Sequence, residues 1–111
     1  MDKISVVMST YNERMEYLSL AIESIISQTH KDIEFIILLD NPQNADIKAL
    51  VGKYAKMDNR ICVIENEHNI GLTASLNKGF NYATGDYYAR MDADDLSLIH
   101  ISEPTRPRLI S

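Results

Sequence analysis

Apolar residues along the chain form short continuous runs, separated by stretches in which they recur every three or four positions. The runs are rich in β-branched residues, as expected of strands covered on both faces: residues 4–8, 33–39, 61–64 and 87–91. The helical spacing between them predicts one helix over about residues 15–28, one that Asn44 or Asp46 caps, and one after Gly71. This alternation predicts an α/β fold, with a mostly parallel βαβαβαβ sheet and helices on both faces.

The apolar positions of the helices predict which side of each one packs on the sheet. Their buried faces are expected to contain Leu18, Ile22, Ile25 and Ile26; Ile47, Leu50, Val51 and Tyr54; and Leu72, Leu76, Phe80 and Ala83. Cys62 lies between Ile61 and Val63, so we expect a buried thiol in the core of the third strand.

Composition and charge describe one globular domain. The chain has 111 residues, of which 45% are hydrophobic and 24% charged. A formal net charge of −5 argues against a nucleic-acid surface, because neutralising phosphates requires basic residues. A single cysteine excludes an internal disulfide, and no apolar run approaches the length of a membrane span.

Polar residues follow every predicted strand. The first strand leads into Thr10, Tyr11 and Glu13; the second ends at Asp40; the third leads to Asn66, Asn69 and Gly71. The carboxyl ends of parallel strands share one edge of the sheet, where ligands of such folds bind. Turn chemistry accounts for some of these residues, but the concentration at every strand end favours a nucleotide pocket, with Tyr11 stacking on a base and Asp40 accepting from a base N–H.

The fourth strand runs directly into Asp92, Asp94 and Asp95. Carboxylates this close repel one another unless a cation neutralises them, and hard oxygen ligands suit Mg²⁺ or Mn²⁺, which also bind substrate phosphates. A solvated acidic turn explains the cluster alone about equally well.

Several segments occur together in an order that resembles the N-terminal, nucleotide-sugar-binding half of a family 2 glycosyltransferase with the GT-A fold. They are residues 6–13 (VVMSTYNE), 24–29 (SIISQT), 69–72 (NIGL), 77–79 (NKG), 83–87 (ATGDY) and 92–95 (DADD). The resemblance covers residues 1–95. Residues 39–42 and 89–92 are most similar to enzymes that build bacterial capsular, exopolysaccharide and lipopolysaccharide sugars.

The resemblance implies roles for individual residues in donor binding. Thr10, Tyr11 and Glu13 would line the base and ribose site, and Asp40 would hydrogen-bond the base, most often uracil. Asn69 and Gly71 complete the substrate-binding residues expected outside the acidic run.

In the acidic run, Asp92, Ala93 and Asp94 match the DxD motif. The two aspartates would hold Mn²⁺ or Mg²⁺ against the diphosphate, and Asp95 would be a further metal ligand. The metal would neutralise charge on the leaving nucleoside diphosphate.

Two positions depart from the family pattern. Many relatives carry two acids at the end of the second strand, where this chain has Leu39 and Asp40, and an arginine where it has Leu76. Lys78 and Arg90 remain as phosphate partners, although we expect Lys78 on a solvated helix surface.

The implied function is sugar transfer from a nucleoside diphosphate sugar, expected to be a UDP-sugar, to a polysaccharide or lipid-linked acceptor. The catalytic base and the acceptor half are expected beyond residue 95, so no catalytic residue is assigned and the chain alone is expected to be inactive. The implied location is cytoplasmic, with peripheral association at the inner membrane face.

Other functions fit the sequence less well. A receiver domain requires paired acids after the first strand, and a nucleotidyltransferase usually has a Gly-rich, basic loop there; residues 9–13 (STYNE) provide neither. A non-catalytic nucleotide-binding module also fits.

Residues 96–111 do not continue the resemblance. Residues 96–106 (LSLIHISEPTR) agree codon by codon with a translation of the transposase adapter used in sequencing libraries. We therefore expect two parts, a glycosyltransferase segment over 1–95 and a non-native or disordered tail over 96–111.

Overall fold

Strands and helices alternate along the chain in the predicted order, and one further strand follows. The computed structural model describes residues 3–27, 32–91 and 98–102. The elements are β1 (Ile4–Thr10), α1 (Met15–Ile26), β2 (Ile33–Leu39), α2 (Ala45–Met57), β3 (Ile61–Glu65), α3 (Leu72–Tyr82), β4 (Tyr87–Met91) and β5 (Leu98–Ser102).

The strands form one sheet in the order β3-β2-β1-β4-β5. β1 lies between β2, which it pairs along its whole length, and β4, which it pairs from Ile4–Tyr87 to Val7–Arg90. The strands β1 to β4 are parallel, so the predicted sheet is confirmed, and β5 adds to β4 in the antiparallel direction. β5 was not predicted. It lies within the segment assigned to the tail, and the non-native origin of that segment stays a prediction.

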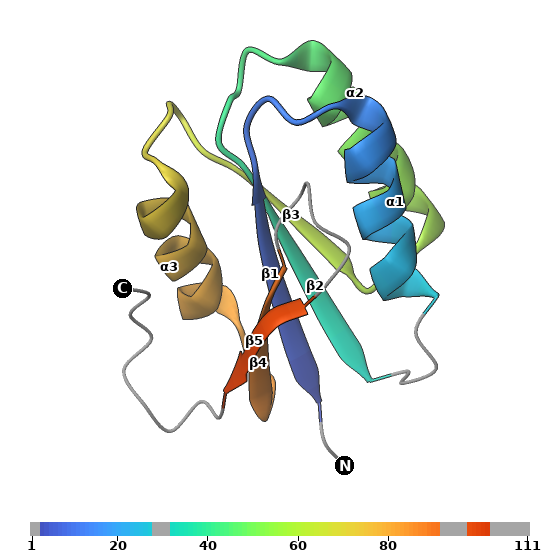
Figure 1. Cartoon of the computed structure of the whole chain (residues 1–111), viewed down its shortest axis with the longest axis vertical. Coiled ribbons are helices and arrows are strands. Elements are labelled where there is room, and N and C mark those ends of the chain that lie inside the picture. Colours follow the sequence, from blue (N-terminus) through green and yellow to red (C-terminus); the bar gives the residue numbers. More distant parts are fainter. Residues whose placement is uncertain (1–2, 28–31, 92–97, 103–111) are drawn as a thin grey trace.

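Helices cover both faces of the sheet, as predicted. Figure 1 shows α1 and α2 on one side and α3 on the other. Because successive side chains of a strand point to opposite faces, Val6 and Met8 pack toward α1 and α2, whereas Val7 packs toward α3. α3 lies close to the sheet at Gly79, where a Cβ atom would come within 2.5 Å of Val7 Cγ1 and 2.6 Å of Leu38 Cδ2.

Two expected core residues are exposed. The Cys62 prediction is wrong: its register partner Ile36 packs toward α3, but α3 mainly covers β1 and β2 and leaves Cys62 on edge strand β3 exposed. Leu72 is 51% exposed. It is the first residue of α3, one turn before the buried Leu76, so it lies beyond the apolar core and beside the polar loop that precedes the helix.

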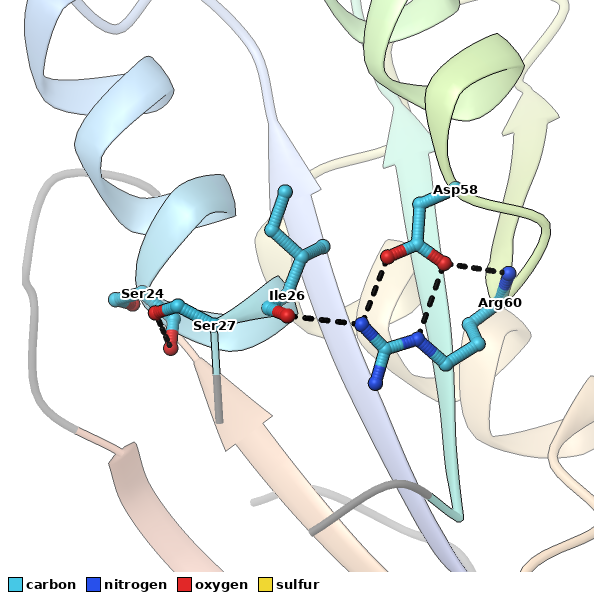
Figure 2. Close-up of polar contacts among 5 residues, drawn as sticks. All are labelled: Ser24, Ile26, Ser27, Asp58 and Arg60. Atoms are coloured by element: carbon cyan, nitrogen blue, oxygen red, sulfur yellow. Dashed lines mark hydrogen bonds and ion pairs between the residues drawn. The ribbon is translucent and has the colours of Figure 1, made fainter. Parts of the chain in front are cut away.

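The α2–β3 turn is tied to the end of α1 through one arginine (Figure 2). The Arg60 guanidinium donates to both carboxylate oxygens of Asp58, at 3.0 and 2.7 Å, and to the Ile26 carbonyl at 2.8 Å. α1 has no basic residue in its last turn, so Arg60 supplies the cation that this helix end favours. The hydrogen bonds from Arg60 lower the pKa of Asp58 below its ordinary value.

Candidate functional site

The loops after β1, β2 and β3 begin at the same level of the sheet. Thr10 pairs with Leu39, and Leu39 pairs with Glu65, so residues 11–14, 40–44 and 66–71 all leave from one edge. This is the edge at which the polar strand ends were expected to meet.

The loop after β1 is fixed by the carboxylate of Glu13. One oxygen of this carboxylate accepts hydrogen bonds from Thr10 Oγ1 at 2.6 Å and from the Tyr11 backbone N–H at 2.7 Å. Thr10 is buried, whereas Tyr11 is 44% exposed. The three predicted residues therefore lie together, and the side chain of Tyr11 is partly open to solvent beside them.

A pocket of about 510 Å³ lies between the loops after β1 and β2. It is lined by Tyr11, Asn12, Asn41, Gln43, Asn44, Ala45 and Asp46. Asn12 Oδ1 accepts from Asn41 Nδ2 and from Asn44 Nδ2, each at 3.0 Å, and so joins the two loops. Asn44 also caps α2, because its Oδ1 accepts from the Ile47 N–H. The volume is in the range of small-molecule sites.

Asp40 is brought to the same edge, but its carboxylate is occupied by the loop after β3. One oxygen accepts from Asn66 Nδ2 at 2.8 Å and the Ile70 N–H at 2.9 Å. The other accepts from Asn69 Nδ2 at 2.8 Å and the Gly71 N–H at 3.0 Å. Asp40 is 2% exposed, so contact with a base would require one of these bonds to open. The expected base contact stays a prediction.

Gly71 and Asn69 take part in the site through Asp40. Gly71 has φ 93°, a conformation that strains residues with a Cβ atom, and its N–H donates to the carboxylate. Asn69 is exposed to solvent, but its side-chain amide donates to Asp40. Asn69 and Gly71, both predicted from the sequence, therefore lie beside the buried aspartate.

Asn66 and Lys78 belong to this site, although no firm role was predicted for either. Lys78 Nζ donates to Asn66 Oδ1 at 2.9 Å, and Asn66 Nδ2 also donates to Ser75 Oγ, which accepts from Ser9 Oγ. The expectation that Lys78 is solvated is wrong: helical side chains lean toward the helix N-terminus, so Lys78 points to the loop edge and is half-buried. The only sequence feature that could have indicated a role for Asn66 is its position directly after β3.

The acidic run Asp92, Ala93, Asp94 and Asp95 lies outside the described residues. It follows Met91 directly, the last residue of the strand that pairs with β1. Within residues 3–27 and 32–91, no group of three or more His, Cys, Asp or Glu side chains is arranged to hold a metal ion. The donor set of the run, three carboxylates, fits the oxygen preference of Mg²⁺ and Mn²⁺.

Comparison with known proteins decides the family. Residues 5–100 match the model of glycosyl transferase family 2. The chain belongs to this family. The family 2 resemblance stated from the sequence motifs is confirmed.

Two family 2 relatives show how much of a full protein the chain represents. An uncharacterized glycosyltransferase of Methanocaldococcus jannaschii is 52% identical over 100 residues, which cover 88% of this chain and 34% of that protein. The amylovoran biosynthesis glycosyltransferase AmsE of Erwinia amylovora is 35% identical over 95 residues, 85% of this chain and 35% of AmsE. The chain thus spans about a third of the length of these relatives.

A solved structure supports the GT-A fold of this family 2 chain. The mannosyltransferase PcManGT of Pyrobaculum calidifontis, determined with GDP-Man and Mn²⁺, superposes with a TM-score of 0.75 at 21% identity. The match covers 84% of this chain and 28% of that one, and at this identity it shows the fold alone. In the described ranges, no helix is both long and apolar enough to cross a bilayer.

Proposed function

We propose that this family 2 domain binds the nucleoside diphosphate sugar donor of a sugar transferase at the carboxyl edge of its sheet. The observation that carries the proposal is the pocket beside Tyr11. It has the volume for a nucleoside, an exposed aromatic ring and several amide groups, and it lies where α/β sheets bind ligands. Thr10 and Glu13 hold the Tyr11 loop, and Asp40 holds Asn69 and Gly71 beside it.

The acidic run is proposed to hold the diphosphate end through Mn²⁺ or Mg²⁺, with Asp92, Asp94 and Asp95 as ligands. The chemistry of the carboxylates supports this assignment, as does the direction of β4, which runs parallel to β1 and ends at Met91, the residue before the run. When bound, the cation neutralises negative charge on the leaving nucleoside diphosphate.

The reaction proposed for the whole protein is transfer from a UDP-sugar to a polysaccharide or lipid-linked acceptor, in the cytoplasm at the inner membrane face. Membership of family 2 and the likeness to AmsE support the reaction class. Because the chain matches about a third of its relatives, the test measures donor binding rather than turnover.

The experiment is calorimetric titration of the 111-residue chain with UDP, with and without Mn²⁺. We expect binding that requires Mn²⁺ and that the double variant Asp92→Ala/Asp94→Ala loses. The matched control Glu16→Ala/Glu65→Ala removes two surface carboxylates and should bind as the wild type does. If UDP, GDP, CDP and TDP all fail to bind a chain shown to be folded by circular dichroism, the proposal is wrong.

A further inference from the structure

Three asparagine side chains form a cluster in the wall of the pocket, and their hydrogen bonds are unevenly distributed. The oxygen of Asn12 is occupied by two internal donors, the Nδ2 groups of Asn41 and Asn44. The oxygens of Asn41 and Asn44 accept from the backbone N–H groups of Gln43 and Ile47. Most acceptor capacity of the cluster is therefore consumed by the protein.

The donor capacity of the same amides is in excess. An amide nitrogen carries two N–H groups. Asn41 and Asn44 each use one of them on Asn12, and within the described residues Asn12 Nδ2 has no hydrogen-bond partner. All three residues line the pocket, so a ligand there meets predominantly N–H donors from this wall.

The charges around the pocket indicate which end of a nucleotide fits. No cation is present among the described residues that line it, and Asp46 contributes a carboxylate. A diphosphate would be repelled by Asp46 and find no counter-charge. The neutral base and ribose suit the pocket, and Tyr11 can stack on the base.

We infer that Asn12, Asn41 and Asn44 are specificity-determining residues for the nucleobase. They select a base that carries a carbonyl oxygen at position 4 of a pyrimidine or position 6 of a purine over the base that carries an amine at that position. This rests on the proposed function, that the pocket holds the nucleoside of the donor. A carbonyl accepts from the free amide N–H groups, whereas an amine against this wall places a donor against donors.

The test compares nucleotides that differ at this group. Uracil and cytosine differ in having O4 or an amine at the same ring position, and guanine and adenine differ likewise at position 6. The 111-residue chain is titrated with UDP, CDP, GDP and ADP at a fixed Mn²⁺ concentration. We expect UDP to bind at least about tenfold more tightly than CDP, and GDP at least about tenfold more tightly than ADP, for each pair that binds measurably.

Variants assign the preference to the amides. Asn44→Asp keeps an oxygen that caps α2 but replaces the amide donor with an acceptor, and Asn41→Asp keeps the acceptor for the Gln43 N–H. Each should reduce the UDP-to-CDP affinity ratio by about tenfold. Asn59→Asp, in the exposed turn before β3 at the opposite end of the sheet, makes the same change in charge and should leave the ratio unchanged.

The outcomes separate the inference from the proposed function. If nucleotides bind with equal affinity, or if folded Asn44→Asp and Asn41→Asp both retain the wild-type ratio, the inference is wrong and the donor site stands. If no nucleotide binds the folded chain, the donor site itself is wrong and the inference falls with it. A carbonyl preference that both variants diminish supports the two together.

Discussion

Asp40 ends β2 with its carboxylate enclosed by donors of a single loop, residues 66–71. Its position in the sequence marked it as a residue that accepts from a ligand. In the folded chain, Asn66, Asn69, Ile70 and Gly71 donate to this carboxylate, and its contact with a base stays a prediction. The buried charge is thus satisfied by side-chain and backbone N–H groups, which is how proteins stabilise ionised carboxylates away from water.

We expect Asp40→Asn to lower the free energy of unfolding by about 2–4 kcal/mol, because its amide N–H groups would face the donors of the loop. Urea denaturation measures this. Asp46→Asn, at an exposed position in the first turn of α2, should change stability by less than about 1 kcal/mol. A fully stable Asp40→Asn variant with weakened UDP binding would instead show that Asp40 contacts the base.

Glu34 links β2 to the segment before β4. Burial raises the pKa of Glu34. Its partners together lower the pKa by more than burial raises it: the Thr84 N–H, the Ser5 hydroxyl, the Lys3 charge and the Thr84 hydroxyl. The pKa therefore lies below its ordinary value of 4.5. A carboxyl whose pKa is lower in the folded state stabilises the fold above its unfolded pKa. That contribution disappears as the pH falls through the folded pKa.

The free energy of unfolding should therefore decrease as the pH is lowered below about 4.5, and Glu34→Gln should flatten this decrease. Urea denaturation between pH 3 and 7 measures both profiles, with Glu16→Gln as a control that removes a surface carboxylate. Identical profiles for Glu34→Gln and the wild type would contradict the assignment.

At the scale of elements, the distance between α3 and the sheet depends on Gly79. We expect Gly79→Ala to cost about 1–3 kcal/mol of stability, because the added methyl group would overlap Val7 and Leu38. Gly52→Ala is the matched control: it lies in α2 with nothing within 4 Å of the added Cβ, so it should stabilise by about 0.5–1 kcal/mol. Thermal denaturation of both variants tests the pair, and equal effects would exclude close packing as the cause.

The elements themselves were predictable because burial repeats along the chain. Continuous apolar runs located β1 to β4, and helical spacing located the three helices. Of the two residues predicted as the cap of α2, Asn44 is the cap and Asp46 lies in the first turn. The exposure of Cys62 was not predictable, because it depends on which strand lies at the edge of the sheet and how far α3 extends over it. Local sequence contains neither fact.

At the scale of the molecule, the sequence predicted where polar residues gather but not how they pair. Thr10, Tyr11, Glu13 and Asp40 reach one edge as expected, since parallel strands deliver their ends together. The bonds from Asn41 and Asn44 to Asn12, and the bond from Asn66 to Asp40, join residues that lie far apart along the chain. Side-chain partners of this kind depend on register and loop geometry.

Donor binding should stabilise the whole domain. A ligand that binds only the folded state at about 100 times its Kd adds about 2.7 kcal/mol, which should raise the Tm by about 10 °C for a domain of this size. Differential scanning calorimetry with UDP and Mn²⁺ measures the shift, and Asp92→Ala/Asp94→Ala should abolish it. A shift of equal size in that variant would show that the acidic run does not hold the cation.

The central place of β1 has a consequence during synthesis on the ribosome. β1 leaves the exit tunnel before the other strands of the sheet and can pair with β2 as soon as β2 emerges, but its other edge must wait for β4, some eighty residues later. The side of the sheet that α3 covers stays exposed until α3 emerges, shortly before β4. Translation speed through residues 66–91 therefore sets how long the nascent chain presents an open strand edge and an apolar face to chaperones.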